Sequence, residues 1–128
     1  MTKLYVGLII LLALTSCTDK EKRDKALKDL DATQQRLIEV NDEISSLETM
    51  LTENISELEV AKDDMNQVQE FQLLRTEDER EQQIRSATEY KLKVEENIEN
   101  IKSNIQYFKD SVSRTEMQIE RLKEFLKN

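Results

Sequence analysis

A seven-residue repeat organises the stretch LDATQQRLIEVNDEISSLETMLTENISELEVAKDDMNQV, residues 30–68. If Leu30 is given the heptad letter a, the a residues are Leu30, Leu37, Ile44, Leu51, Leu58 and Met65. The d residues are Thr33, Val40, Leu47, Asn54, Ala61 and Val68. Apolar residues sustained at a and d predict a coiled-coil helix, and the 3.5-residue period predicts a left-handed supercoil.

A second repeat covers the C-terminal half of the chain, in a different phase. Its a residues are Ile84, Lys91, Ile98, Ile105, Val112, Ile119 and Leu126, and its d residues are Ala87, Val94, Ile101, Phe108, Thr115 and Leu122. If the first repeat is continued into the C-terminal half, its heptad frame places an a position at Glu79. The frame of the second repeat requires an a position at Glu77. Insertions of about three or four residues, the usual breaks in coiled coils, do not repair this offset. Two separate helices are therefore predicted.

The segment between the two repeats carries a signal for the start of a helix. Thr76-Glu77-Asp78-Glu79 has the S/T-x-x-E form of a capping box. Glu77 and Asp78 would lie favourably in the positive first turn of a helix. We therefore predict a turn near residues 73–76, a second helix from about Glu77, and an all-α antiparallel helical hairpin over residues 26–128.

A fold about Thr76 specifies which core residues face each other. It pairs Leu30 with Leu122, Val40 with Val112, Ile44 with Phe108, Leu51 with Ile101, Met65 with Ala87 and Val68 with Ile84. It also places Glu48 near Lys102 on the flank and returns the C-terminus beside residues 24–26. A shift of one heptad in either direction aligns the two frames as well. We prefer the fold about Thr76 because the last core residues of the two repeats then meet each other.

The first residues are typical of a signal peptide. Lys3 precedes an apolar run of 11 residues from Leu4 to Leu14, which is shorter than the roughly 20 residues that span a bilayer but fits a signal sequence. Leu14-Thr15-Ser16-Cys17 follows and resembles the lipobox of bacterial lipoproteins. That resemblance implies a signal peptide over residues 1–16, cleavage before Cys17, a diacylglycerol on the Cys17 thiol and an acylated amine. The alternatives are an ordinary secreted protein with a stray cysteine after its signal peptide, or a free buried thiol.

The resemblance also implies a location. Two or more acyl chains, such as palmitate, anchor a protein stably, so the chain is expected in the cell envelope, held by lipid. Thr18 follows the cysteine where inner-membrane retention in some lineages uses Asp, so the resemblance favours the outer membrane over the inner membrane. Residues 17–25 would be the lipidated tether. Because residues 19–25 are all charged, we interpret them as a solvated tether or a frayed first helical turn.

Composition excludes several classes of function. The chain has 27 Asp and Glu, 19 Lys and Arg, no His and a net charge of −8, which opposes nucleic-acid binding because phosphates supply most of that affinity. Without His the commonest general base is missing, and no phosphate loop or metal-ligand spacing is present. We predict no enzyme, no catalytic residues, no cofactor, no metal and no small-molecule substrate. The acidic segment from Asp42 to Asp64 is interpreted as a solvated surface, because carboxylates along a helix diverge whereas Ca²⁺ needs converging oxygens.

Surfaces for protein partners are suggested by apolar residues outside the core. Phe71, Leu73 and Leu74 fall at the predicted turn, where they either close the end of the hairpin or contact a partner. The a and d residues form the contact between the helices, which we call the seam. Apolar residues at the neighbouring e and g positions widen the apolar surface: Leu27, Met50, Ile55, Tyr90 and Phe125. Because a two-helix hairpin buries little area per residue, a homo-oligomer or a protein partner is expected. The polar core residues are assigned structural roles in setting register: Thr33, Asn54, Lys91 and Thr115.

The general plan of a lipobox followed by heptads resembles the small murein lipoprotein family of Gram-negative bacteria. That family ends in a lysine that is linked to peptidoglycan, whereas here Lys127 is followed by Asn128, so this linkage does not carry over. The predicted function is a structural, spacer or protein-docking element of the envelope. The alternatives are a periplasmic chaperone, since long hairpins resemble the arms of jawed periplasmic chaperones, or a surface-exposed ligand-binding lipoprotein.

Overall fold

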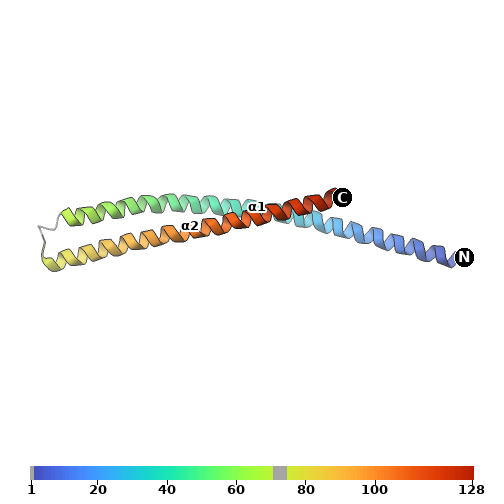
Figure 1. The fold of residues 1–128 in the computed structure, drawn as a ribbon, viewed down its shortest axis with the longest axis horizontal. Helices are drawn as coiled ribbons and strands as arrows, with labels where there is room; N and C mark the ends of the chain where they lie inside the picture. The colour runs from blue at the N-terminus through green and yellow to red at the C-terminus, as the bar shows by residue number, and fades with distance from the viewer. Residues whose placement is uncertain (1, 71–74) are drawn as a thin grey trace. The chain divides into compact units, whose positions relative to one another are not determined.

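The protein is a hairpin of two long helices. The computed structural model describes the backbone of residues 2–70 and 75–128, with side chains from Thr18 onward in those ranges. Helix α1 spans Thr2–Glu70 and helix α2 spans Glu77–Lys127, and the described residues contain no strand. The two helices pack against each other (Figure 1), which confirms the predicted all-α helical hairpin.

The reversal of the chain lies between Glu70, where α1 ends, and Glu77, where α2 begins. The start of α2 agrees with the residue predicted from the capping box. The box itself is closed in both directions: the backbone N–H of Thr76 donates to Glu79 Oε2 at 3.2 Å, and the N–H of Glu79 donates to Thr76 Oγ1 at 3.4 Å. Two N–H groups that the helix cannot satisfy internally are thereby paired.

The hairpin divides into two compact units. The terminal unit comprises residues 1–40 and 111–128, and the central unit comprises residues 41–110. Each unit consists of one stretch of α1 packed on one stretch of α2. The contacts below are described within each unit.

The heptad frame of α1 is confirmed by burial. Among residues 18–70, every residue that is buried or half-buried lies at an a or d position, and every other residue is exposed. These positions are Ala26, Leu30, Thr33, Leu37, Val40, Ile44, Leu47, Leu51, Asn54, Leu58, Ala61, Met65 and Val68. One seam therefore runs along the described part of α1.

The heptad frame of α2 is confirmed in the same way. All its predicted a and d residues from Ile84 to Leu126 are buried or half-buried. Five further residues of α2 are half-buried. Arg80 lies at the d position before Ile84, and four lie beside the seam at e or g positions: Gln83, Thr88, Glu95 and Ser111. The phase shift between the two frames thus corresponds to two separate helices, as predicted.

The core of the central unit shows which register the helices adopt. Leu47 clusters with Ile101 and Ile105, and Leu51 and Phe108 pack against them. This cluster agrees with the fold about Thr76, which faces Leu51 with Ile101. A shift of one heptad would instead place Leu47 opposite Ile98 or Val112, and neither belongs to the cluster.

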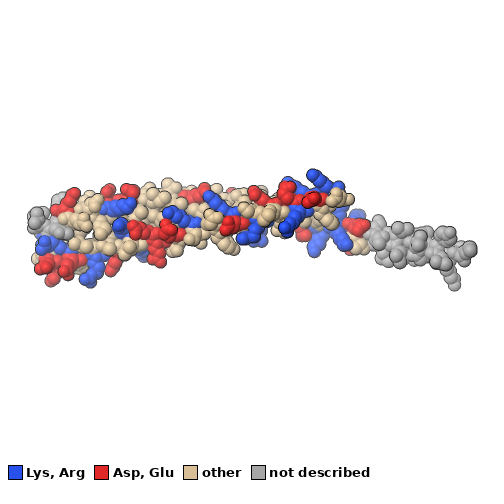
Figure 2. Space-filling view, viewed as in Figure 1, with Lys and Arg blue, Asp and Glu red and all other residues tan. Residues whose placement is uncertain are grey.

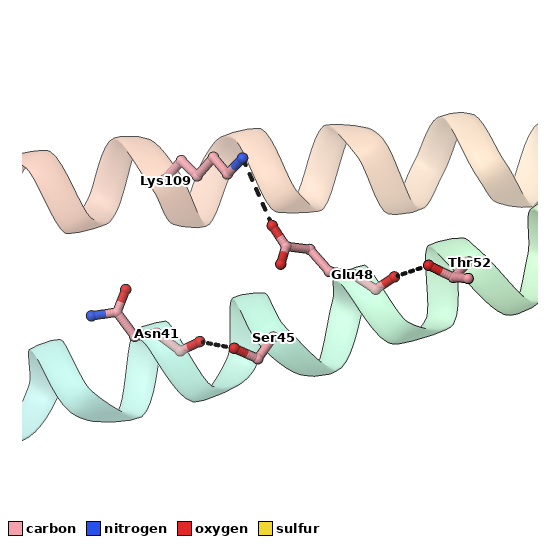
Figure 3. Close-up of polar contacts among 5 residues, drawn as sticks. All are labelled: Asn41, Ser45, Glu48, Thr52 and Lys109. Carbon is pink, nitrogen blue, oxygen red and sulfur yellow. Dashed lines mark hydrogen bonds and ion pairs between the residues drawn. The ribbon is translucent and has the colours of Figure 1, made fainter.

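The predicted contact of Glu48 with Lys102 is wrong. Glu48 Oε1 lies 3.9 Å from Lys109 Nζ (Figure 3), and Lys102 pairs with Glu99 on its own helix at 3.1 Å. Side chains in a helix tilt toward its N-terminus. In antiparallel helices these tilts oppose each other, so Glu48 and Lys109 lean together, whereas Lys102 leans away from Glu48.

In the terminal unit, the C-terminal end of α2 contacts α1 near Arg23. Arg23 Nη2 donates a 2.9 Å hydrogen bond to the backbone carbonyl of Leu126, in agreement with the predicted return of the C-terminus beside residues 24–26. Residues 19–25 are exposed, as expected for a solvated segment, but they are helical throughout. The cation of Arg23 on a carbonyl at the C-terminal end of α2 is electrostatically favourable, because this end of a helix is negative.

Candidate functional site

The residues predicted to carry function fall largely outside the described side chains. Leu14, Thr15, Ser16 and Cys17 lie in the part of α1 whose side chains are not described, and Phe71, Leu73 and Leu74 lie between the two described ranges. The lipidation site and the partner contact at the turn therefore stay predictions. Each unit carries an open groove on its described surface.

The groove of the central unit lies close to the reversal of the chain. It is an open hollow of about 460 Å³, lined by Asp64, Gln67, Val68, Arg75, Gln83, Ser86, Ala87 and Tyr90. Small side chains at Ser86 and Ala87 form part of its wall, and Asp64 and Arg75 place opposite charges on its lining. Its openness to solvent provides no enclosed pocket in which reacting groups could be desolvated.

Tyr90 and Glu57 form the polar contact that links the helices beside this groove. The Tyr90 hydroxyl donates a 2.7 Å hydrogen bond to Glu57 Oε1. This hydrogen bond is the main cause that raises the pKa of Tyr90 above its ordinary value, with smaller contributions from desolvation and from the charges of Glu57 and Asp64. From the sequence, Tyr90 was expected only to widen the apolar surface. Both residues occupy g positions, which face each other across an antiparallel seam, and that rule could have found the pair.

The groove of the terminal unit has a volume of about 540 Å³ and is lined by Asp19, Lys20, Lys22, Arg23, Phe125 and Asn128. It combines three cations of α1 with the ring of Phe125, which is 52% exposed. The hydrogen bond from Arg23 to Leu126 holds the two sides of this groove together. In sequence, the groove begins two residues after Cys17.

The polar residues of the seam are satisfied within their own helices. The hydroxyl groups of Thr33 and Thr115 donate to the carbonyls of Asp29 and Ser111, four residues earlier. Asn54 Nδ2 donates to the carbonyl of Met50 at 2.8 Å. Each of these three side chains thus has a hydrogen-bond partner on its own helix, whereas the buried Nε of Arg80 has none among the described residues.

Lys91, the charged residue of the seam, is also accommodated on its own helix. Its ammonium lies 3.8 Å from the Glu95 carboxylate, and a third of its side chain stays exposed. The charge thus remains at the surface while the aliphatic part of the side chain occupies the seam. This arrangement supports a structural role for Lys91.

The surface outside the seam is strongly charged. Figure 2 shows Lys, Arg, Asp and Glu side chains of both signs interspersed with other side chains on the face in view. The carboxylates of the acidic segment from Asp42 to Asp64 are all exposed. Within residues 18–70 and 75–128, no group of three or more potential ligands could hold a metal ion.

Ten large apolar side chains are exposed among the described residues, including the five predicted to widen the apolar surface. They are Leu27, Ile38, Met50, Ile55, Val60, Tyr90, Leu92, Tyr107, Met117 and Phe125. In the described part of the chain, no helix combines the length and the apolar character required to cross a membrane.

The chain matches no model of a known protein family, no curated protein and no solved structure.

Proposed function

We propose that this protein is a lipid-anchored coiled-coil lipoprotein of the bacterial cell envelope, in which the hairpin acts as a structural, spacer or protein-docking element. The observation that carries the proposal is the sequence Leu14-Thr15-Ser16-Cys17, which resembles a lipobox and stands directly before the charged start of the heptad region. By this proposal, Cys17 becomes the lipid-modified first residue of the mature protein. The resemblance favours the outer membrane as the place of anchoring.

Two features of the hairpin support a role in structure or docking. The grooves of the described surface are open to solvent. The polar seam residues Thr33, Asn54 and Thr115 form hydrogen bonds within their own helices. The contact between Arg23 and Leu126 brings the last turn of α2 to the segment that follows Cys17. Within the terminal unit, the C-terminal end of α2 would therefore lie close to the lipid anchor.

Labelling with a fatty acid tests the proposal. The full chain, expressed in a bacterium with radiolabelled or alkyne-tagged palmitate, should incorporate the label and lose residues 1–16, and Cys17→Ser should abolish the label. Thr18→Ser, just outside the lipobox, serves as a matched control that keeps the motif and the thiol. If the parent chain carries no label, or if Cys17→Ser carries as much as the parent, the proposed lipoprotein is wrong.

A further inference from the structure

One flank of α2 in the central unit carries a row of side chains that are nearly all uncharged. We call it the neutral stripe: Gln83, Ser86, Tyr90, Lys93, Asn97, Asn100, Asn104 and Tyr107, of which only Lys93 is charged. The other flank of α2 is different, because six of the nine e and b residues between Glu81 and Lys109 are charged. Such a row is unusual in a unit in which residues 41–110 hold 18 Asp and Glu and eight Lys and Arg.

Two contacts between the helices identify the flank on which the neutral stripe lies. The g residues Tyr90 and Glu57 meet across one side of the seam, and the e residues Lys109 and Glu48 meet across the other. The neutral stripe consists of the g and c residues of α2, so it lies on the Tyr90 side. Met50 and Val60, at g and c of α1, belong to the same side.

The neutral stripe is available for a partner. Tyr107 is 63% exposed and Tyr90 is 38% exposed, while Met50 and Val60 are 45% and 55% exposed. The three Asn side chains are also exposed. Interfaces are enriched in Tyr and depleted in Lys and Glu relative to the remaining surface, and this flank of α2 has that composition.

The spacing of the stripe specifies the geometry of the partner. Its residues follow one another at alternating intervals of three and four, which is the spacing of a coiled-coil seam. In a parallel pair of identical helices, each residue of such a seam faces its own copy across the two-fold axis. A charged residue would then face the same charge. Asn, Gln, Ser and Tyr both donate and accept hydrogen bonds, so they are compatible with their own copies.

From these observations we propose that the neutral stripe binds a second copy of this chain, side by side and in parallel, with α2 against α2. A different protein could complement any charge on its partner, so it would not require a row without charges. Of the acidic g and c residues of α1 on this flank, Glu57 already accepts the hydrogen bond of the Tyr90 hydroxyl. The others are Glu43, Glu53 and Asp64, and they belong to α1, which takes no part in the pairing of α2 with α2. Lys93 can extend its flexible side chain to solvent.

The energetics of the hairpin favour such a contact. Among the described residues no large side chain is fully buried, and only eight apolar residues form the buried core. A second copy would cover Tyr90 and Tyr107, whose rings bring large contact area. A parallel pair also places both anchors in one membrane. This last point rests on the proposed function, whereas the argument from the stripe does not.

Single cysteines in the full chain with Cys17→Ser, purified in mild detergent, test the contact and its direction. After mild oxidation, Asn97→Cys and Asn104→Cys should each give a disulfide-linked dimer, because both residues face their own copies. Ser103→Cys, on the outer face of α2, should stay monomeric. Cross-linking at only one of the two Asn positions would contradict the parallel arrangement. In an antiparallel pair of helices, a residue faces its own copy only where the two-fold axis crosses the contact.

Charges introduced on the stripe test its specificity in the same Cys17→Ser chain. Asn97→Glu with Asn104→Glu should weaken the dimer, measured by analytical ultracentrifugation, about a hundredfold, because the new charges would face each other at the contact. The control Gln82→Glu with Ser103→Glu adds the same charge on the outer face and should change dissociation less than threefold. Circular dichroism checks that both variants stay helical. A monomeric parent, or equal weakening in both variants, overturns the proposal, and neither result depends on lipidation.

Discussion

The hydroxyl of Tyr90 on α2 donates a 2.7 Å hydrogen bond to the carboxylate of Glu57 on α1. This contact joins residues 33 positions apart in the chain and marks the flank of the central unit on which the g residues of both helices meet. It also ties the protonation of a tyrosine to the pairing of the helices.

The stability of the hairpin should fall at high pH because of this contact. The pKa of Tyr90 in the folded state is raised above 10.0, so the folded state holds this proton more tightly than the unfolded state. The contribution is therefore fully present below the unfolded pKa and is lost as pH rises through the folded pKa. Absorbance titration of the phenolate at 295 nm in a background with Tyr5→Phe and Tyr107→Phe, which leaves Tyr90 of the three tyrosines, should show a lower midpoint for Tyr90 in Glu57→Gln than in the parent. An unchanged midpoint would contradict the contact.

The capping box at the start of α2 should stabilise the hairpin. Thr76→Ala removes the hydroxyl that accepts from the Glu79 N–H, and we expect it to lower the free energy of unfolding by about 1 kcal/mol. Thr76→Ser keeps the hydroxyl and should stay within about 0.5 kcal/mol of the parent. Thermal or urea unfolding followed by circular dichroism measures both. Equal losses for the two variants would show that the hydroxyl makes no contribution.

Ala61 should tolerate no larger side chain. It is fully buried, with 0% of its surface exposed, whereas its neighbour Val60 is 55% exposed. We expect Ala61→Leu to destabilise the hairpin by about 1–3 kcal/mol, because added methylenes strain a packed core. Val60→Leu is the matched control and should change stability by less than about 0.5 kcal/mol. Urea unfolding compares the two, and a neutral Ala61→Leu would mean that the seam is open at this position.

The ion pair between Glu48 and Lys109 should make a small, specific contribution. Both side chains are more than half exposed, so a double-mutant cycle with Glu48→Gln and Lys109→Gln should give a coupling energy of about 0.2–1 kcal/mol. The same cycle with Lys102→Gln should give a coupling near zero, since Lys102 pairs with Glu99. A larger coupling of Glu48 to Lys102 would mean that the helices are shifted relative to the structure.

Most of the fold could be predicted because it depends on local sequence patterns. Heptad spacing needs only the periodicity of a helix, and every non-exposed position of α1 from 18 to 70 agrees with the predicted frame. The capping box needs only four neighbouring residues, Thr76 to Glu79. The failure at Glu48 has a physical reason, because heptad letters place side chains on a flank but ignore their tilt along the helix.

The candidate site was less accessible to prediction. The resemblance of Leu14 to Cys17 to a lipobox needs only a short linear motif, and it stays a prediction. The contact between Tyr90 and Glu57 depends instead on how the helices align. The register of the two frames repeats every heptad, so sequence spacing alone admits several alignments. The cluster of Leu47 with Ile101 and Ile105 distinguishes among them.

By itself, the sequence determined that this protein has two helices, where α2 begins and which face of each helix is buried, because these depend on periodicity and on local hydrogen bonds. Only the tertiary structure decided which residues meet across the seam. Lys109, not Lys102, reaches Glu48, and Arg23 reaches the Leu126 carbonyl. These contacts depend on the axial alignment and opposed tilts of two helices, which no segment of the chain specifies alone. The antiparallel pairing also decides which α1 residues share a flank with the neutral stripe, since Glu57 meets Tyr90 on that side.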